Sequence, residues 1–187
     1  MDKNKHRCFW VEDACDLYIK YHDDEWGVPT YDDGKLFEFL ILENFQAGLS
    51  WLTILKKREY FREAFDGFDA VKMSRYDDAK ILQLLENKNI IRNVSKIKAA
   101  VNNAKVFLEI QKEFGSFSNY IWSFTNNKII KNNNVNEKNI PTSSPLSDKV
   151  SKDLIKRGMK FVGTVTIYSY LQSIGVVNDH EESCFKH

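Results

Sequence analysis

Apolar side chains recur at three- and four-residue intervals along most of this chain, and this spacing restricts it to a helical fold. One such set follows Asp32 and Asp33, which can cap the start of a helix, and another begins at Trp51, beyond Gly48. Because each set covers one face of a helix, the two helices are expected to pack against each other. The spacing therefore predicts an all-α fold.

Further along the chain, the same spacing predicts amphipathic helices at residues 81–85 and 97–108, with a hairpin at 87–95 between them. Another helix is expected at about 147–157, where it ends at a glycine. Residues 161–167 are rich in β-branched side chains, so a strand is the alternative there. Residues 81–108 thus combine two helices with a hairpin.

The length of 187 residues suffices for one hydrophobic core, so residues 1–187 are expected to form a single helical domain. Residues 125–145 contain many asparagines, followed within the same range by Pro141 and Pro145. This composition predicts an exposed, mobile loop without chemistry of its own. The amino end lacks an apolar signal, and no run approaches the roughly 20 apolar residues of a membrane span. A cytoplasmic protein is expected, and its formal charge of +1 does not by itself indicate a nucleic-acid partner.

Cysteine and histidine side chains near the two ends of the chain form a candidate metal site. Cys8 and His22 lie near the amino end, and His180 and Cys184, four residues apart, share one face if their segment is helical. Two thiolates and two imidazoles suit a structural zinc ion, because they leave no position for a substrate water. The alternative is ordinary thiols, one core histidine and one capping histidine, with Cys15 as a competing ligand.

Aromatic and acidic side chains gather in two short segments. Residues 21–29 (YHDDEWGVP) combine aromatics, a histidine and carboxylates, and residues 43–51 begin with Glu43 and end with Trp51. Together they could line an aromatic pocket with one acid, which suits a flat, cationic ring such as a damaged base. For Glu43 the alternative is exposure on a helix surface. Core packing is the alternative for each aromatic residue: Trp10, Tyr21, Trp26 and Trp51.

The predicted hairpin is locally basic although the whole chain is nearly neutral. No acidic residue lies between Glu86 and Glu109, a stretch that contains Lys88, Arg92, Lys96, Lys98 and Lys105. Such a stretch can contact DNA phosphates without reading sequence. Taken alone, this basic stretch would equally support a helix-hairpin-helix DNA-binding module without enzymatic activity.

Segments spread over the chain together resemble the 3-methyladenine DNA glycosylase I family, from about Cys8 to Cys184. They are 8–10 (CFW), 21–29 (YHDDEWGVP), 46–59 (QAGLSWLTILKKRE), and 160–163 (KFVG) leading to 177–180 (VNDH). The resemblance implies an all-α, helix-hairpin-helix glycosylase scaffold, with the hairpin near residues 89–96 on the DNA phosphates. The basic side chains expected to contact these phosphates are Arg92, Lys96 and Lys98. The structural zinc ligands that the resemblance implies are Cys8, His22, His180 and Cys184.

The resemblance also implies roles for individual side chains. The family's base-pocket glutamate falls on Glu43, its pocket tyrosine on Tyr21 and its stacking tryptophan on Trp51. Trp10 and Trp26 are implied as further walls of the pocket. Gly48 and Leu49 are implied to fill the gap left by the extruded nucleotide. The implied activity is excision of 3-methyladenine from alkylated double-stranded DNA by base flipping. No lysine is assigned as a Schiff-base nucleophile, so strand cleavage is not expected. The protein is expected to be a monomer.

Overall fold

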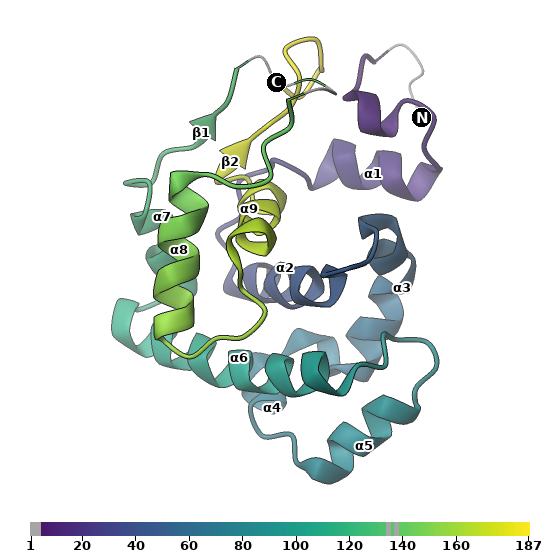
Figure 1. Cartoon of the computed structure of the whole chain (residues 1–187), viewed down its shortest axis with the longest axis vertical. Coiled ribbons are helices and arrows are strands. Elements are labelled where there is room, and N and C mark those ends of the chain that lie inside the picture. The colour runs from purple at the N-terminus through teal and green to yellow at the C-terminus, as the bar shows by residue number, and fades with distance from the viewer. Residues whose placement is uncertain (1–4, 134–135, 137–138) are drawn as a thin grey trace.

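The computed structural model describes residues 5–133, 136 and 139–187, and its described part is mostly helical, as the spacing predicts (Figure 1). A short parallel strand pair, which the sequence did not predict, joins Ile130 to Val177 and Lys131 to Asn178. The elements in chain order are η1 (Phe9–Val11), α1 (Asp16–Asp24), α2 (Asp33–Gln46), α3 (Trp51–Ala64), η2 (Asp66–Phe68), α4 (Ala70–Met73), α5 (Asp78–Glu86), α6 (Val94–Phe114), α7 (Phe117–Ser123), β1 (Ile130–Lys131), α8 (Pro145–Lys156), α9 (Thr164–Ser173) and β2 (Val177–Asn178).

Helix α2 is the central element of the core. It packs against α3, α6, α7 and α9, and Figure 1 shows it in the middle of the molecule. Its start is fixed by Asp32, whose side chain accepts a hydrogen bond of 2.8 Å from the backbone N–H of Lys35. Residues 36–45 are all buried, so neighbours cover the helix on every side rather than on one face. The predicted pair of packed helices, α2 and α3, is confirmed.

Helices α5 and α6 lie on either side of residues 87–93, so both predicted helices and the intervening turn are present. The side chain of Asn93 accepts a hydrogen bond of 3.1 Å from the backbone N–H of Lys96 and so caps the start of α6. Helix α6 ends at Gly115, whose φ of +81° suits glycine. In the turn between the two helices, Ile90 is buried, whereas the polar side chains Lys88, Asn89, Arg92 and Asn93 are exposed.

Helix α8 covers the helix predicted at 147–157, and it starts two residues earlier because Ser144 and Ser147 form a capping box. The strand alternative for 161–167 is wrong, since α9 begins at Thr164. Local β propensity yields there to tertiary packing: Ile167 and Leu171 are fully buried, and α9 packs against α2 and α8. No helix in the described residues is long and apolar enough to cross a membrane.

The two ends of the chain lie close together, at the same end of the molecule in Figure 1. The backbone N–H of Phe185 donates to the carbonyl of His6 over 3.0 Å, and the backbone N–H of Phe9 donates to the Glu181 carboxylate over 3.1 Å. The asparagine-rich stretch reaches the same region through β1. Its described residues are largely exposed, as predicted, while 134–135 and 137–138 lie outside the described residues.

Candidate functional site

A cavity of about 150 Å³ lies where η1, α1, α2, the start of α3 and the α9–β2 segment meet. It contains every aromatic and acidic residue that the sequence analysis assigned to a pocket. Ile140, from the stretch predicted as an exposed loop without chemistry of its own, also lines this cavity. Its lining residues are Cys8, Phe9, Trp10, Tyr18, Tyr21, Trp26, Glu43, Gln46, Trp51, Ile140, Ser169, Gln172, Asp179 and Glu181.

Glu43 is an acidic side chain enclosed by the protein. It is only 3% exposed, which excludes the helix-surface alternative, because α2 is surrounded by other elements. Its Oε2 atom has no hydrogen-bond partner among the described residues. Burial raises the pKa of Glu43 to about 8, so the carboxyl group is largely protonated at neutral pH while the cavity is empty. A cation in the cavity would favour the ionised form.

Aromatic rings form the walls around this acid. The Tyr21 and Trp51 ring centroids lie 5.4 Å apart, and those of Trp10 and Trp26 lie 5.0 Å apart with the rings edge to face. The indole Nε1 of Trp51 is buried and finds no acceptor in the part of the chain that the structure describes. The cavity therefore offers flat apolar surfaces together with an unpaired donor and an unpaired acid.

Tyr18 is a wall residue that the sequence analysis missed. Its ring centroid lies 4.9 Å from that of Trp10, and burial, followed by the charge of Glu43, raises its pKa. Tyr18 precedes Tyr21 by three residues in α1, and residues at this spacing share a helix face. Recognising α1 as a helix would have placed Tyr18 in the pocket.

Asp179 is a second acidic wall residue that the sequence analysis did not assign. It is 2% exposed and accepts hydrogen bonds from Tyr168 Oη at 2.7 Å, Gln172 Nε2 at 2.6 Å and Asn132 Nδ2 at 2.6 Å. These three donors are an amide of asparagine, an amide of glutamine and a tyrosine hydroxyl, so hydrogen bonds from neutral groups fix the orientation of this side chain. Asn132 belongs to the asparagine-rich stretch, which thus supports the site directly.

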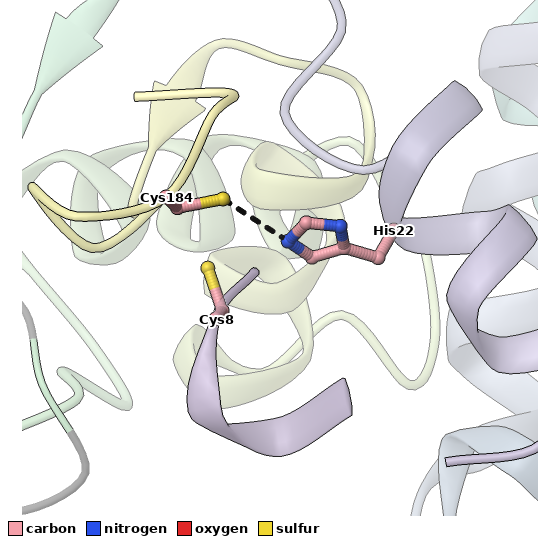
Figure 2. Close-up of side chains that lie close together, drawn as sticks. All are labelled: Cys8, His22 and Cys184. Carbon is pink, nitrogen blue, oxygen red and sulfur yellow. Dashed lines mark hydrogen bonds between the residues drawn. The ribbon is translucent and has the colours of Figure 1, made fainter. Parts of the chain in front are cut away.

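Figure 2 shows a cluster of buried cysteine and histidine side chains, and one of them, Cys8, also lines the cavity. The candidate ligand atoms of Cys8, His22 and Cys184 all lie within 4.8 Å of one another. Cys184 Sγ is 3.5 Å from His22 Nε2, while His22 Nδ1 faces the Asp23 carboxylate at 2.9 Å. The hydrogen bond between the two thiols raises the pKa of Cys8 and lowers that of Cys184, which favours one thiolate in the pair.

His180 lies outside this group of three but next to it. Its ring packs edge-on against that of His22, with centroids 5.1 Å apart. Nδ1 of His180 is 2.8 Å from the Asn178 side-chain oxygen, and Nε2 is buried without a partner in the described chain. Burial lowers its pKa to about 4, so the ring is neutral at pH 7. The segment from His180 to Cys184 forms turns, so the two residues do not share a helix face as the spacing allowed. The competing ligand Cys15 is exposed.

Four of the five residues predicted to contact DNA are exposed, and the fifth, Lys96, is buried. Gly48, with a φ of +82°, and Leu49, which is 40% exposed, form the turn between α2 and α3. Arg92 and Lys98 are also exposed, as a phosphate contact requires.

Lys96 differs from these residues, because it is only 6% exposed. Its Nζ donates to the carbonyls of Phe45 at 2.8 Å and Ala47 at 2.6 Å. The ammonium group therefore caps the carboxyl end of α2. This placement argues against the direct phosphate contact that its position in the basic hairpin suggested.

Comparison with known proteins assigns the chain to a family. A DNA-3-methyladenine glycosylase from Haemophilus influenzae is 46% identical over 178 residues, which cover 95% of this chain and 96% of the relative. A crystal structure of 3-methyladenine DNA glycosylase I superposes with a TM-score of 0.93 at 46% identity, covering 97% of this chain and all of that one (100%). A tyrosine-to-phenylalanine variant of a 3-methyladenine DNA glycosylase I, solved in complex with 3-methyladenine, superposes with a TM-score of 0.92 at 37% identity, over 96% of each chain. The methyladenine glycosylase family model matches residues 10–187, and the chain belongs to this family.

Proposed function

We propose that this protein is a cytoplasmic, monomeric DNA-3-methyladenine glycosylase that hydrolyses the N-glycosidic bond of 3-methyladenine in alkylated double-stranded DNA. The observation that carries the proposal is the buried Glu43 carboxyl group, whose unpaired oxygen lies in an aromatic cavity. A protein that only binds DNA phosphates does not need such a group. The names of the relatives and the bound 3-methyladenine in one of them support the same substrate.

The reaction follows from the charge of the damaged base. Methylation at N3 makes adenine cationic, so the bond between C1′ and N9 is already weak. When it breaks, its electron pair moves to N9 and the base leaves as neutral 3-methyladenine. A water oxygen bonds to C1′ and loses a proton, which restores the balance of charge. Because the base leaves neutral, the main task of the site is to select the methylated base.

Selection rests on the contrast between the empty and the filled cavity. A cationic base would lower the pKa of Glu43 from about 8 and bring the carboxylate into its charged form, which then hydrogen-bonds the edge of the base. Tyr21 and Trp51 would stack on the flipped ring, and the unpaired Trp51 Nε1 supplies a donor. Unmodified adenine is neutral and provides no such compensation for a buried carboxylate.

Binding of DNA would use the turn at 87–93 as the hairpin of a helix-hairpin-helix motif, with Arg92 and Lys98 at the phosphates. Gly48 and Leu49 would fill the gap left by the flipped nucleotide, because their turn is exposed beside the cavity. Lys96 would not contact the phosphates; its side chain would fix the carboxyl end of α2. No lysine serves as a Schiff-base nucleophile in this mechanism, so the enzyme is expected to leave both strands intact.

Cys8, His22 and Cys184 bring their ligand atoms together, and we propose that His180 joins them as the fourth ligand of one structural zinc ion. Two buried cysteines and His22 present donor atoms to one another, and the adjacent His180 has a neutral ring with an unpaired buried Nε2. Tetrahedral zinc takes two thiolates and two imidazoles. His22 and His180 would ligate through Nε2, because their Nδ1 atoms face Asp23 and Asn178. The ion would clip the two ends of the chain together and leave no coordination position for substrate.

The test is release of free base from methylated duplex DNA, resolved by chromatography, for wild type and for Glu43→Gln. We expect wild type to release 3-methyladenine and Glu43→Gln to lose at least about tenfold in rate while still binding duplex DNA. Glu59→Gln, at an exposed position of α3, is the matched control and should behave as wild type. Salt-sensitive DNA binding without base release would favour a non-enzymatic binding module. Strand nicks before alkali or heat would contradict the absence of lyase chemistry.

A further inference from the structure

The turn that precedes α9 holds an aromatic side chain in a strained backbone conformation. Phe161 has a φ of +55°, in the left-handed region that a residue with a bulky side chain rarely adopts. The same side chain is 39% exposed, so it is not packed fully into the core. Strain of this kind persists only where the surroundings enforce it, and it is common at sites that bind a ligand.

Two fully buried asparagines enforce this conformation. Asn44 Nδ2 donates to the carbonyl of Phe161 over 3.0 Å. Asn103 Nδ2 donates to the carbonyl of Lys160 over 2.8 Å, and Asn103 Oδ1 accepts from the backbone N–H of Lys160 over 2.8 Å. The two asparagines also bond each other over 2.7 Å. The backbone of the turn is therefore fixed by side chains from α2 and α6.

A shallow hollow of about 440 Å³ lies beside this turn. Among the described residues that line it, none is acidic and two are lysines, Lys98 and Lys160, both exposed. The hollow continues from the turn at 87–93, because its lining includes Ser95 and Lys98 from the first turns of α6. The complete lining is Ser95, Lys98, Ala99, Asn102, Lys160 and Phe161. This surface complements a polyanion with apolar faces.

The turn is also held in register with the base cavity. Asn44, which bonds the carbonyl of Phe161, directly follows Glu43 in α2. Any shift of Phe161 relative to the pocket would therefore break a buried hydrogen bond. This connection suits a residue that must meet a DNA strand at a fixed distance from the flipped base.

We infer that residues 160–163 form a second DNA-contacting turn, in which Phe161 packs against the sugar faces of one strand while Lys98 and Lys160 flank its phosphates. The inference rests on the proposed function, because it assigns this surface to the same DNA substrate. Phosphate contacts add affinity without sequence preference, and the rigid aromatic ring adds apolar contact at one defined position.

The test compares Phe161→Ala and Phe161→Gly with wild type in two binding assays. The first uses a duplex that contains a tetrahydrofuran abasic-site analogue, and the second follows quenching of tryptophan fluorescence by free 3-methyladenine. We expect both variants to lose about tenfold in duplex affinity while binding the free base as wild type does. Phe161→Gly should unfold at the same temperature as Phe161→Ala or higher, because glycine relieves the positive φ.

Lys160→Gln and Phe161→Tyr complete the experiment. The first should reduce the slope of log affinity against log salt by about one, and the second should retain duplex binding because the ring remains. Wild-type duplex affinity in both Phe161→Ala and Phe161→Gly would overturn the inference. If these variants fail to fold, an unchanged salt slope in Lys160→Gln would overturn it instead. Failure of wild type to release any base would count against the proposed function and not against this turn.

Discussion

The ammonium group of Lys96 lies 2.6 Å from the carbonyl oxygen of Ala47, the residue that precedes Gly48. This contact connects the start of α6, next to the hairpin, to the end of the helix that carries Glu43. The α2–α3 turn is thereby fixed from the side of the protein that is proposed to hold the phosphates. Hydrogen bonds of Lys96 thus connect the helix that carries Glu43 and the start of the α2–α3 turn to the helix that follows the hairpin.

The first prediction concerns Lys96→Met, which keeps most of the side-chain length and removes its two hydrogen bonds. We expect a loss of about 1–3 kcal/mol in the free energy of unfolding, because buried carbonyls lose a charged partner. The salt dependence of duplex binding should remain that of wild type, whereas Arg92→Gln should lower its slope by about one. Both slopes can be measured by fluorescence anisotropy over a salt series. An equal drop in both variants would return Lys96 to the phosphate surface.

The second prediction concerns pH and Glu43. Burial raises its pKa from 4.5 to about 8 in the folded chain, so between these values the folded state binds one proton more than the unfolded state. The free energy of unfolding therefore falls as pH rises through this window, by on the order of 3–5 kcal/mol in total. Above the window it no longer changes with the ionisation of this group. Glu43→Gln lacks this dependence. Urea unfolding of both proteins at pH 5 and pH 8.5 would test it, and parallel changes in the two would contradict the buried carboxyl as the cause.

Helices that bury a regular apolar face were predictable, and contacts between distant segments were not. The spacing located α2, α3, α5, α6 and α8 because it follows from local geometry. The segment that forms α1 was interpreted only as a site, since its aromatic and charged residues obscure its helical spacing. The strand pair β1–β2 depends on Ile130 meeting Val177, which no local pattern encodes.

The site shows the same division at the level of side chains. The residues carried over from the family resemblance, including Glu43 and Trp51, were identified by type and motif. The burial of Lys96 and the support of Asp179 by Asn132 arise only after folding, because each partner comes from a remote segment. The spacing placed Glu43 on a helix whose outer face would normally be exposed. Glu43 is buried because other elements pack around α2, and the spacing alone does not encode that packing.

The third prediction concerns the zinc ion that we propose for the terminal cluster. Cys8→Ser should purify with little zinc and unfold at least about 5 °C below wild type, because the two ends of the chain are no longer joined. Cys15→Ser is the matched control, since Cys15 is exposed, and it should retain one zinc ion per chain. Metal analysis and thermal unfolding measure the two effects. Equal zinc content in both variants would show that Cys8 is not a ligand.

The last prediction concerns the unpaired indole N–H of Trp51. Trp51→Phe keeps an aromatic surface next to Tyr21 but removes the buried donor. We expect the affinity for free 3-methyladenine to fall about tenfold, the value of one hydrogen bond in a dry pocket, while the unfolding temperature changes little. Trp122→Phe is the contrasting control: its indole donates to the Thr30 carbonyl over 2.9 Å in the core. That variant should lose stability and keep base affinity, as calorimetry and fluorescence quenching can determine. If Trp51→Phe binds the base as wild type does, the ring alone recognises it, and the donor has no part in selection.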